Sequence, residues 1–171
     1  MKVLMFIADG VEDLEFFYSY YRLLEEGFTV DVAGPKRGVV TGKHGYTFET
    51  NLSFADPVAD DYDILVLPGG RGPETVRLDG GVLQICREMM DAGKIIAAIC
   101  HGPQVLISAD LVRGKNATCW QGVRDDLKAA GAIVHDEEVV VDGNLITSRK
   151  PEDLPAFCRE ITRLVHAESK F

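Results

Sequence analysis

Hydrophobic positions fall in short continuous runs that alternate with stretches of helical spacing. The runs at residues 3–8, 63–67 and 94–99 lack regular polar alternation, so they predict strands buried on both faces. Residues 28–33 are predicted to form a further strand. Residues 12–26 instead repeat apolar side chains every three or four positions and stop at a glycine, which predicts a helix. This alternation indicates an α/β fold with a mostly parallel central sheet and helices on both faces.

The rest of the chain continues the same alternation. Further helices are predicted at residues 74–92 (interrupted near the glycines at 80 and 81), 103–109, 123–130 and 151–166. Residues 38–50 are predicted to form a small hairpin or a loop excursion, residues 138–148 a hairpin, and residues 117–119 a short strand. The sequence contains no repeat, linker or low-complexity tract, so we expect a single domain over residues 1–171.

Composition narrows the class of protein. The 171 residues carry 18 basic and 27 acidic side chains, a formal net charge of −9, which argues against nucleic acid and anionic membranes as partners. The apolar run at residues 1–8 is too short for a signal peptide. Four scattered cysteines without metal-site spacing are typical of free thiols in a reducing compartment. We therefore expect a cytoplasmic protein that needs no metal or cofactor.

The strongest chemical signal follows the strand predicted at residues 94–99. Cys100 comes directly after it, and His101, Gly102 and Pro103 open the next predicted helix. This is the form of a nucleophile elbow, in which a strand-to-helix turn exposes a reactive side chain. A helix N-terminus is expected to lower the pKa of the thiol. The alternative is that Cys100 is a small buried hydrophobe.

The other cysteines give weaker signals. Cys86 and Cys158 lie on apolar helical stripes and are assigned to the core, and Cys119 is ambiguous with packing favoured.

Two further segments are expected beside Cys100, because the carboxyl ends of parallel strands share one edge of a sheet. Gly70 ends a Pro-Gly-Gly turn, and its backbone N–H and that of His101 can form an oxyanion hole. Glu12 follows the first strand. It is either a helix-start carboxylate or, if burial raises its pKa, a general acid or base for Cys100.

Several motifs together resemble the intracellular protease I (PfpI-type) group of the ThiJ/PfpI superfamily. They are LVLPGGRGPE (65–74), AAICHGP (97–103), TGKHGY (41–46) and VVVDGN (139–144), and the likeness runs from KVLMFIADGVEDLE to the last predicted helix. The resemblance implies a flavodoxin-like three-layer sandwich. It also implies dimers that assemble further into hexamers.

The resemblance assigns roles to particular residues. It implies a reactive Cys100, a neighbouring His101, a Glu12 hydrogen-bonded to the thiol, and a Glu74 that enters the site from an adjacent subunit. Trp120 is assigned to the substrate-binding part of the site. It stands where the group often has tyrosine, so the resemblance does not carry over a role of a phenol hydroxyl in substrate binding or proton transfer.

Three functions follow from a reactive thiol at this position. The first is a cysteine hydrolase, either a peptidase or a protein or amino-acid deglycase, in which Cys100 attacks a carbonyl. The second is a glutathione-independent glyoxalase that converts methylglyoxal to lactate, with Glu12 moving the proton. The third is a redox-sensing stress protein without catalysis. The first is preferred, with a small carbonyl compound or a peptide as substrate.

Overall fold

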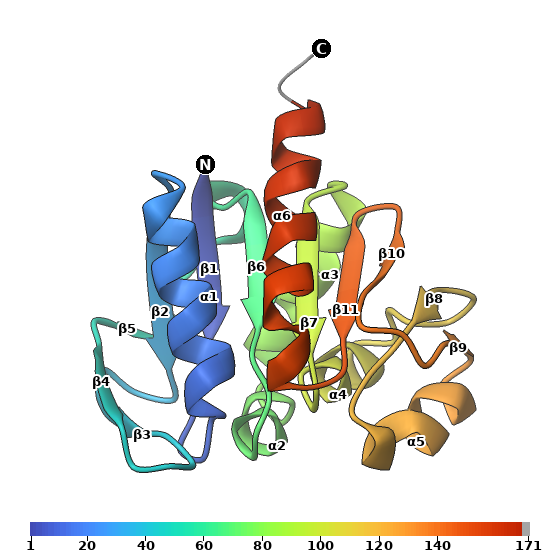
Figure 1. The fold of residues 1–171 in the computed structure, drawn as a ribbon. Helices are drawn as coiled ribbons and strands as arrows, with labels where there is room; N and C mark the ends of the chain where they lie inside the picture. The colour runs from blue at the N-terminus through green and yellow to red at the C-terminus, as the bar shows by residue number, and fades with distance from the viewer. Residues whose placement is uncertain (169–171) are drawn as a thin grey trace.

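The computed structural model describes residues 1–168, and its centre is a seven-stranded sheet (Figure 1). Every neighbouring pair of strands is parallel except β10 and β11, which form a hairpin. The mostly parallel sheet expected from the sequence is thus confirmed. In spatial order the strands are β10 (Val140–Asp142), β11 (Leu145–Ser148), β7 (Ile95–Ile99), β6 (Ile64–Leu67), β1 (Lys2–Phe6), β2 (Thr29–Gly34) and β5 (Leu52–Ser53).

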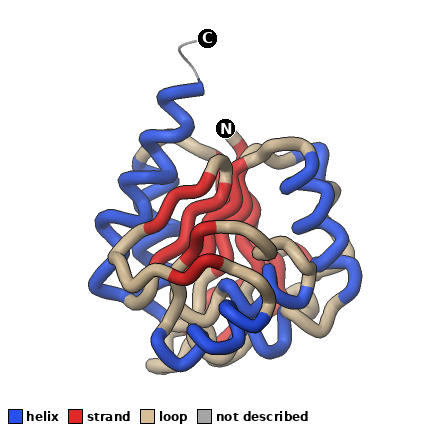
Figure 2. The backbone as a smooth tube through the Cα atoms, turned by 90° about the vertical axis from the view of Figure 1, so that its right-hand side faces the viewer, coloured by secondary structure: helices blue, strands red, loops and turns tan. Residues whose placement is uncertain are grey.

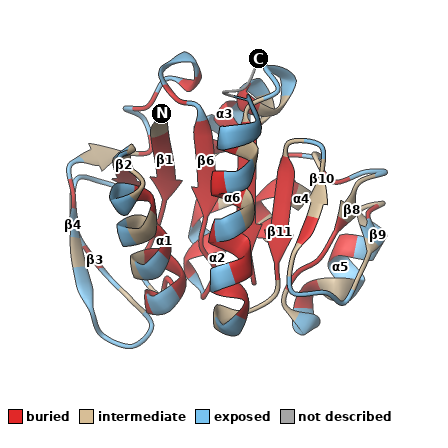
Figure 3. Ribbon diagram, turned by 45° about the horizontal axis from the view of Figure 1, so that its top comes forward, coloured by how far each residue is buried: buried red, intermediate tan, exposed pale blue. Residues whose placement is uncertain are grey.

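Helices cover both faces of the sheet, as Figure 2 shows. On one face lie α1 (Asp13–Glu25) and α6 (Leu154–Glu168), which bury side chains such as Phe16 and Phe157 against the strands. The other face is covered by α3 (Gly80–Asp91), α4 (Pro103–Ser108) and α5 (Arg124–Ala129). The two hydrophobic clusters explain why β6 and β7 lack polar residues: both are buried throughout (Figure 3).

Smaller elements occupy the connections. Two-stranded sheets are formed by β3 (Gly38–Thr41) with β4 (Thr47–Thr50), and by β8 (Asn116–Ala117) with β9 (Ile133–Val134). Helix α2 (Gly72–Val76) follows β6, and single 3₁₀ turns lie at Ala59–Asp61, Gln121–Val123 and Pro151–Asp153.

The helix predicted at residues 74–92 is interrupted as expected, but the break lies earlier than the glycines. Chain residues 77–79 separate α2 from α3, and Gly80 and Gly81 are the first residues of α3. The side chain of Asp79 accepts a hydrogen bond from the N–H of Val82 at 3.0 Å and so caps α3. The strand predicted at 117–119 is shorter and ends at Ala117.

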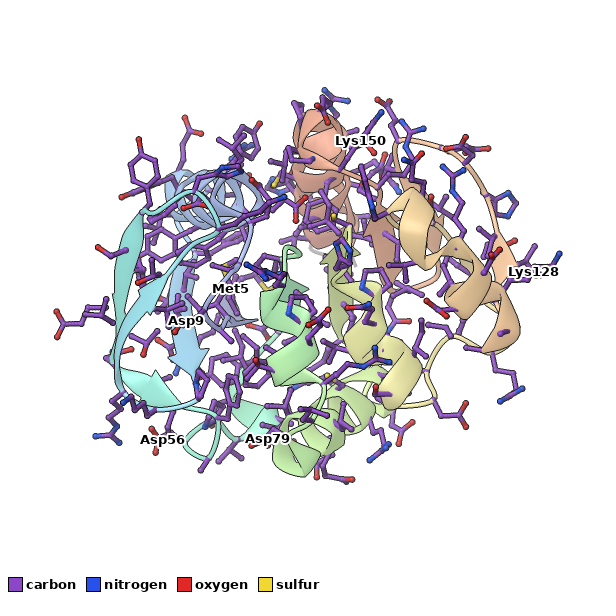
Figure 4. All side chains as sticks on the ribbon, turned by 90° about the horizontal axis from the view of Figure 1, so that it is seen from below. Met5, Asp9, Asp56, Asp79, Lys128 and Lys150 are labelled. Atoms are coloured by element: carbon purple, nitrogen blue, oxygen red, sulfur yellow. The ribbon has the colours of Figure 1, made fainter. Side chains whose placement is uncertain are left out.

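All the parallel strands end at one edge of the sheet, which Figure 4 views directly. The loops after β1, β6 and β7 therefore meet there, as the strand-end rule predicts. Within residues 1–168, no helix has both the length and the apolar character that a membrane crossing requires.

Candidate active site

Cys100 sits on a strained turn between β7 and α4. Its φ is 65°, a left-handed conformation that only one other non-glycine residue in the described chain adopts. Two backbone hydrogen bonds hold it there: its N–H donates to Ser148 O at 3.0 Å, and its carbonyl accepts from Trp120 N at 3.0 Å. Strand β11 and the segment before the 3₁₀ turn Gln121–Val123 thus hold a nucleophile elbow at the strand-end edge of the sheet.

Backbone amides approach the sulfur from two loops. The N–H groups of Gly70 and His101 both interact with the Cys100 thiol in the sense that favours the thiolate. Gly70 has a φ of 77°, which allows its loop to turn back toward the thiol. A side chain on neighbouring Gly69 would place its Cβ only 2.8 Å from that of Cys100. The pair of amides proposed for the oxyanion hole therefore lies beside the thiol.

A buried carboxyl group completes the surroundings of the sulfur. Glu15 of α1 has no exposed surface, and its Oε1 accepts a hydrogen bond from Gly69 N at 2.8 Å. The carboxyl lies close enough to the thiol of Cys100 for each to shift the pKa of the other. Its second oxygen has no nitrogen or oxygen partner among residues 1–168, so it is available to the sulfur.

Burial sets the protonation states of this pair. Burial, reinforced by the charge of Glu12, raises the pKa of Glu15 from 4.5 to about 8. The carboxyl is therefore mostly protonated at neutral pH and can donate a hydrogen bond to the sulfur. Burial also raises the pKa of the Cys100 thiol, with the charge of Glu15 as the second cause.

This corrects the expectation of an acidic thiol. Helix α4 has only six residues and begins three positions after Cys100, so its dipole is small and burial outweighs it.

The imidazole of His101 is positioned to take the proton of the thiol. Its Nδ1 lies 3.3 Å from Cys100 Sγ. Burial lowers the pKa of His101, against an opposing effect of the charge of Glu74, so the ring is neutral at neutral pH and able to accept a proton. The indole of Trp120 stacks on it, with ring centroids 6.4 Å apart and an interplanar angle of 27°.

These groups open into one cavity of about 670 Å³ at the strand-end edge. It is lined by Glu12, Glu15, Gly70, Cys100, His101 and Trp120, together with polar and charged residues from the β3–β4 loop and from the segments around residues 121–124, 136 and 149–152. Glu74 is exposed and does not line it, nor does it hydrogen-bond to His101 within this chain. A cavity of this size suits a small organic substrate.

The model of the DJ-1/PfpI family matches residues 1–164. The chain belongs to this family. Deglycase PfpI of Pyrococcus furiosus is 49% identical over 165 residues, which cover 96% of this chain and 99% of that protein. Protein/nucleic acid deglycase 2 of Escherichia coli is 41% identical over 169 residues, covering 97% and 98%.

Solved structures agree with this membership. Drosophila melanogaster DJ-1beta superimposes with a TM-score of 0.87 at 34% identity, covering 94% of this chain and 87% of that one. Schizosaccharomyces pombe DJ-1 gives a TM-score of 0.89 at 29% identity, covering 96% and 92%. The expected resemblance to the PfpI-type group and the flavodoxin-like sandwich are both confirmed.

Within this DJ-1/PfpI chain, the carboxyl group beside the thiol belongs to Glu15, and the placement of Glu12 there is wrong. Glu12 is the residue before α1, and its Oε2 caps the helix by accepting from Glu15 N at 3.0 Å. Its Oε1 faces His44 Nε2 at 3.2 Å. The sequence does contain a signal for Glu15, because it shares the buried stripe of α1 with Phe16, Ser19 and Leu23. Burying a carboxylate on such a stripe is energetically unfavourable, which indicates a functional role.

His44 is exposed and lines the cavity. One potential ligand atom from each of Glu12, Asp13 and His44 lies within 4.8 Å of the other two, a spacing that could hold a metal ion. Asp13 is already engaged, however: its oxygens accept from the backbone N–H groups of His44 at 2.7 Å and Tyr46 at 3.1 Å. The cluster therefore fastens the β3–β4 hairpin to α1.

The three other cysteines pack in the hydrophobic clusters. Cys86 and Cys158 are buried as predicted, and the undecided Cys119 is also fully buried. Burial raises the pKa of Cys86 and Cys119 to about 12 and that of Cys158 to about 11. None of the three lines the cavity, so Cys100 is the one thiol that a ligand there can meet.

Proposed function

We propose that this protein is a thiol-dependent deglycase, which removes the adducts that α-oxoaldehydes form with amino or thiol groups. The observation that carries the proposal is the convergence of a thiol, a neutral imidazole, a protonated carboxyl group and two backbone amides in one cavity. The relatives named deglycases, at 41% and 49% identity, support the same reaction class.

The chemistry begins with activation of the thiol. His101 takes the proton of Cys100 through the 3.3 Å contact, and the sulfur becomes bonded to the former aldehyde carbon of the adduct. The amine or thiol of the substrate leaves with a proton. The N–H groups of Gly70 and His101 face the sulfur and stabilise the negative oxygen that develops beside it.

Glu15 is the natural group to move the next proton. Its carboxyl, with a pKa of about 8, can exchange a proton near neutral pH. In its ionised form Glu15 takes the proton from the sulfur-bearing carbon and returns it to the adjacent carbonyl carbon. The hydroxyl proton of the sulfur-bearing carbon moves to the oxygen of that carbonyl, and the intermediate becomes a thioester of a hydroxy acid. Water then hydrolyses the thioester, which releases the hydroxy acid and restores the Cys100 thiol.

The decisive experiment removes the thiol. Cys100→Ala is expected to abolish loss of methylglyoxal adducts of N-acetylcysteine, whereas Cys158→Ala, which removes a thiol buried outside the cavity, is expected to retain it. Fluorogenic peptides assayed in parallel test the peptidase alternative. Adduct turnover by folded Cys100→Ala at the wild-type rate would refute the proposal.

Free methylglyoxal is a second candidate substrate, because the same buried Glu15 beside Cys100 can move the proton of a hemithioacetal. The two activities differ in what limits the rate. A deglycase removes the adduct faster than the adduct dissociates spontaneously, whereas a glyoxalase cannot exceed that rate. Comparing enzymatic loss with uncatalysed release of the same adduct separates them.

We further propose a homo-oligomer in the cytoplasm, with Glu74 completing the site of a neighbouring subunit. Support comes from exposed apolar side chains on α1 (Leu14, Tyr18 and Tyr21) and from Tyr46 on the adjacent hairpin, because contiguous exposed apolar side chains are typical of interfaces. The four cysteines are free thiols, which supports a reducing compartment. Sedimentation analysis tests the assembly.

A further inference from the structure

Basic side chains gather around the cavity of a protein whose net charge is −9. Five basic residues line it: Lys43, Arg71, Arg124, Arg149 and Lys150. Two of them form ion pairs within the chain, because Arg124 and Arg149 both bind Asp136 Oδ1, at 2.6 and 2.9 Å. Arg149 also pairs with the buried Asp153 at 3.0 Å. These two arginines therefore stabilise the wall of the cavity.

The other three have no such partner. Within residues 1–168, the side chains of Lys43, Arg71 and Lys150 make no hydrogen bond or ion pair; we call these three the open cations. They come from separate segments: the β3–β4 loop, the β6–α2 loop, and the residue before the 3₁₀ turn Pro151–Asp153. Figure 4 shows Lys150 near the start of α6, at the strand-end edge.

The acidic residues of the cavity do not cancel these charges. Four acidic residues line the cavity: Glu12, Glu15, Asp136 and Glu152. Glu15 is mostly uncharged at neutral pH because its pKa is about 8, so three acidic residues face the five basic ones and leave the cavity with an excess of positive charge. The ammonium group of Lys43 is close enough to act on the pKa values of both Glu15 and His101. A positive charge without a counter-ion thus lies within electrostatic range of the reacting groups. Such a field attracts anions to a cleft.

We propose that the open cations form an anion subsite, which selects adducts carrying a carboxylate or phosphate group. This rests on the proposed deglycase function, since the subsite would bind the part of the substrate that leaves. Arg71 offers a planar fork for two oxygens, and the two lysines add point charges from other sides. Free amino acids and peptide C-termini supply a carboxylate, and nucleotides supply a phosphate.

A binding experiment tests the subsite without turnover. The probes are S-(2-oxopropyl)-N-acetylcysteine and its carboxamide, which differ only in the negative charge, titrated calorimetrically into Cys100→Ala. The acid is expected to bind roughly tenfold more tightly than the amide at low salt. The difference is expected to shrink at about 1 M salt, where the Debye length is only about 3 Å. Equal affinities at low salt would overturn the proposal.

Charge-removing variants locate the effect. Lys43→Gln, Arg71→Gln and Lys150→Gln, each in the Cys100→Ala background, are expected to reduce the preference for the acid by roughly two- to fivefold. The matched control is Lys128→Gln, since Lys128 is exposed, lies at the outer rim of α5 (Figure 4) and does not line the cavity. An undiminished preference in all three variants would also overturn the proposal.

A second arm identifies the source of the anion. Methylglyoxal adducts of deoxyguanosine and of its 5′-monophosphate are compared as substrates of the wild-type protein, beside adducts of N-acetylcysteine and its amide. A preference for the carboxylate or for the phosphate member of a pair assigns the subsite to that group, and no preference in either pair contradicts it. If the wild-type protein turns over none of these adducts but calorimetry still shows tighter binding of the acid than of the amide, the deglycase function is refuted and the anion subsite is not.

Discussion

The carboxyl group of Glu15 lies against the thiol of Cys100, at the point where α1 meets the end of β7. Glu15 is fully buried and fixed by the N–H of Gly69. Its raised pKa keeps it mostly protonated at neutral pH, whereas a charged carboxylate beside the sulfur raises the pKa of the thiol. The pair thus couples activation of the nucleophile to a group that can exchange protons.

Removing the proton of Glu15 is expected to impair turnover strongly. Glu15→Gln keeps the size and one hydrogen-bond donor but cannot transfer a proton, so kcat should fall by about a hundredfold or more. Glu12→Gln is the matched control, because Glu12 caps α1 and faces His44 instead of the sulfur. It should lose less than about tenfold. Steady-state kinetics on a methylglyoxal adduct measure kcat for both variants. A larger loss of kcat in Glu12→Gln than in Glu15→Gln would assign the proton transfer to Glu12.

Stability should depend on pH through the same carboxyl group. The pKa of Glu15 is about 8 when folded and 4.5 ordinarily, so the folded state holds an extra proton between these values. Stability from this group is complete below the unfolded pKa and is lost as pH rises through the folded pKa. Glu15→Gln has no such loss. Urea unfolding at about pH 5 and about pH 9 measures the free energy of unfolding of both proteins. The value for the variant relative to wild type should be higher at about pH 9 than at about pH 5.

The sequence predicts the frame of the site well. Apolar runs predict β1, β6 and β7, the segment 28–33 predicts β2, and the rule for parallel strands places Gly70 and Cys100 on one edge. The turn after β7 is predicted from Cys100 together with its context, because His101, Gly102 and Pro103 open a helix directly after the buried strand.

Helix phase explains what the sequence did not reveal. Glu12 and Glu15 lie less than one turn apart, and the choice between them depends on where α1 starts, which local patterns locate poorly. The open cations lie on loops with no periodicity, so their convergence emerges only from the sheet order. The pKa of Cys100 depends on burial by residues distant in sequence, which outweighs the local helix dipole.

Backbone strain at Cys100 should be measurable as stability. A left-handed conformation costs a non-glycine residue roughly 1–2 kcal/mol, and the flexibility of glycine in the unfolded chain offsets part of that gain. Cys100→Gly is therefore expected to unfold with a free energy about 0.5–1 kcal/mol higher than that of Cys100→Ala. Both variants lack the thiol, so chemical denaturation compares the backbone effect alone. A less stable glycine variant would show that the φ of 65° is not strained.

Glu74 tests whether the site is shared between subunits. It is exposed on α2 and makes no hydrogen bond with His101 in its own chain, although its charge affects the pKa of His101. If Glu74 acts across an interface, Glu74→Gln and Cys100→Ala should each be inactive alone. Each mixed dimer, however, holds one intact site, with Cys100 from one chain and Glu74 from the other.

Unfolding and refolding the two variants together in equal amounts should then restore about one quarter of wild-type turnover, because half of the dimers are mixed and each has one working site. Refolded single variants provide the baseline. Glu74→Gln with wild-type activity would remove Glu74 from the mechanism. An inactive Glu74→Gln that gains nothing on mixing would place the action of Glu74 within its own chain, where its charge already reaches His101.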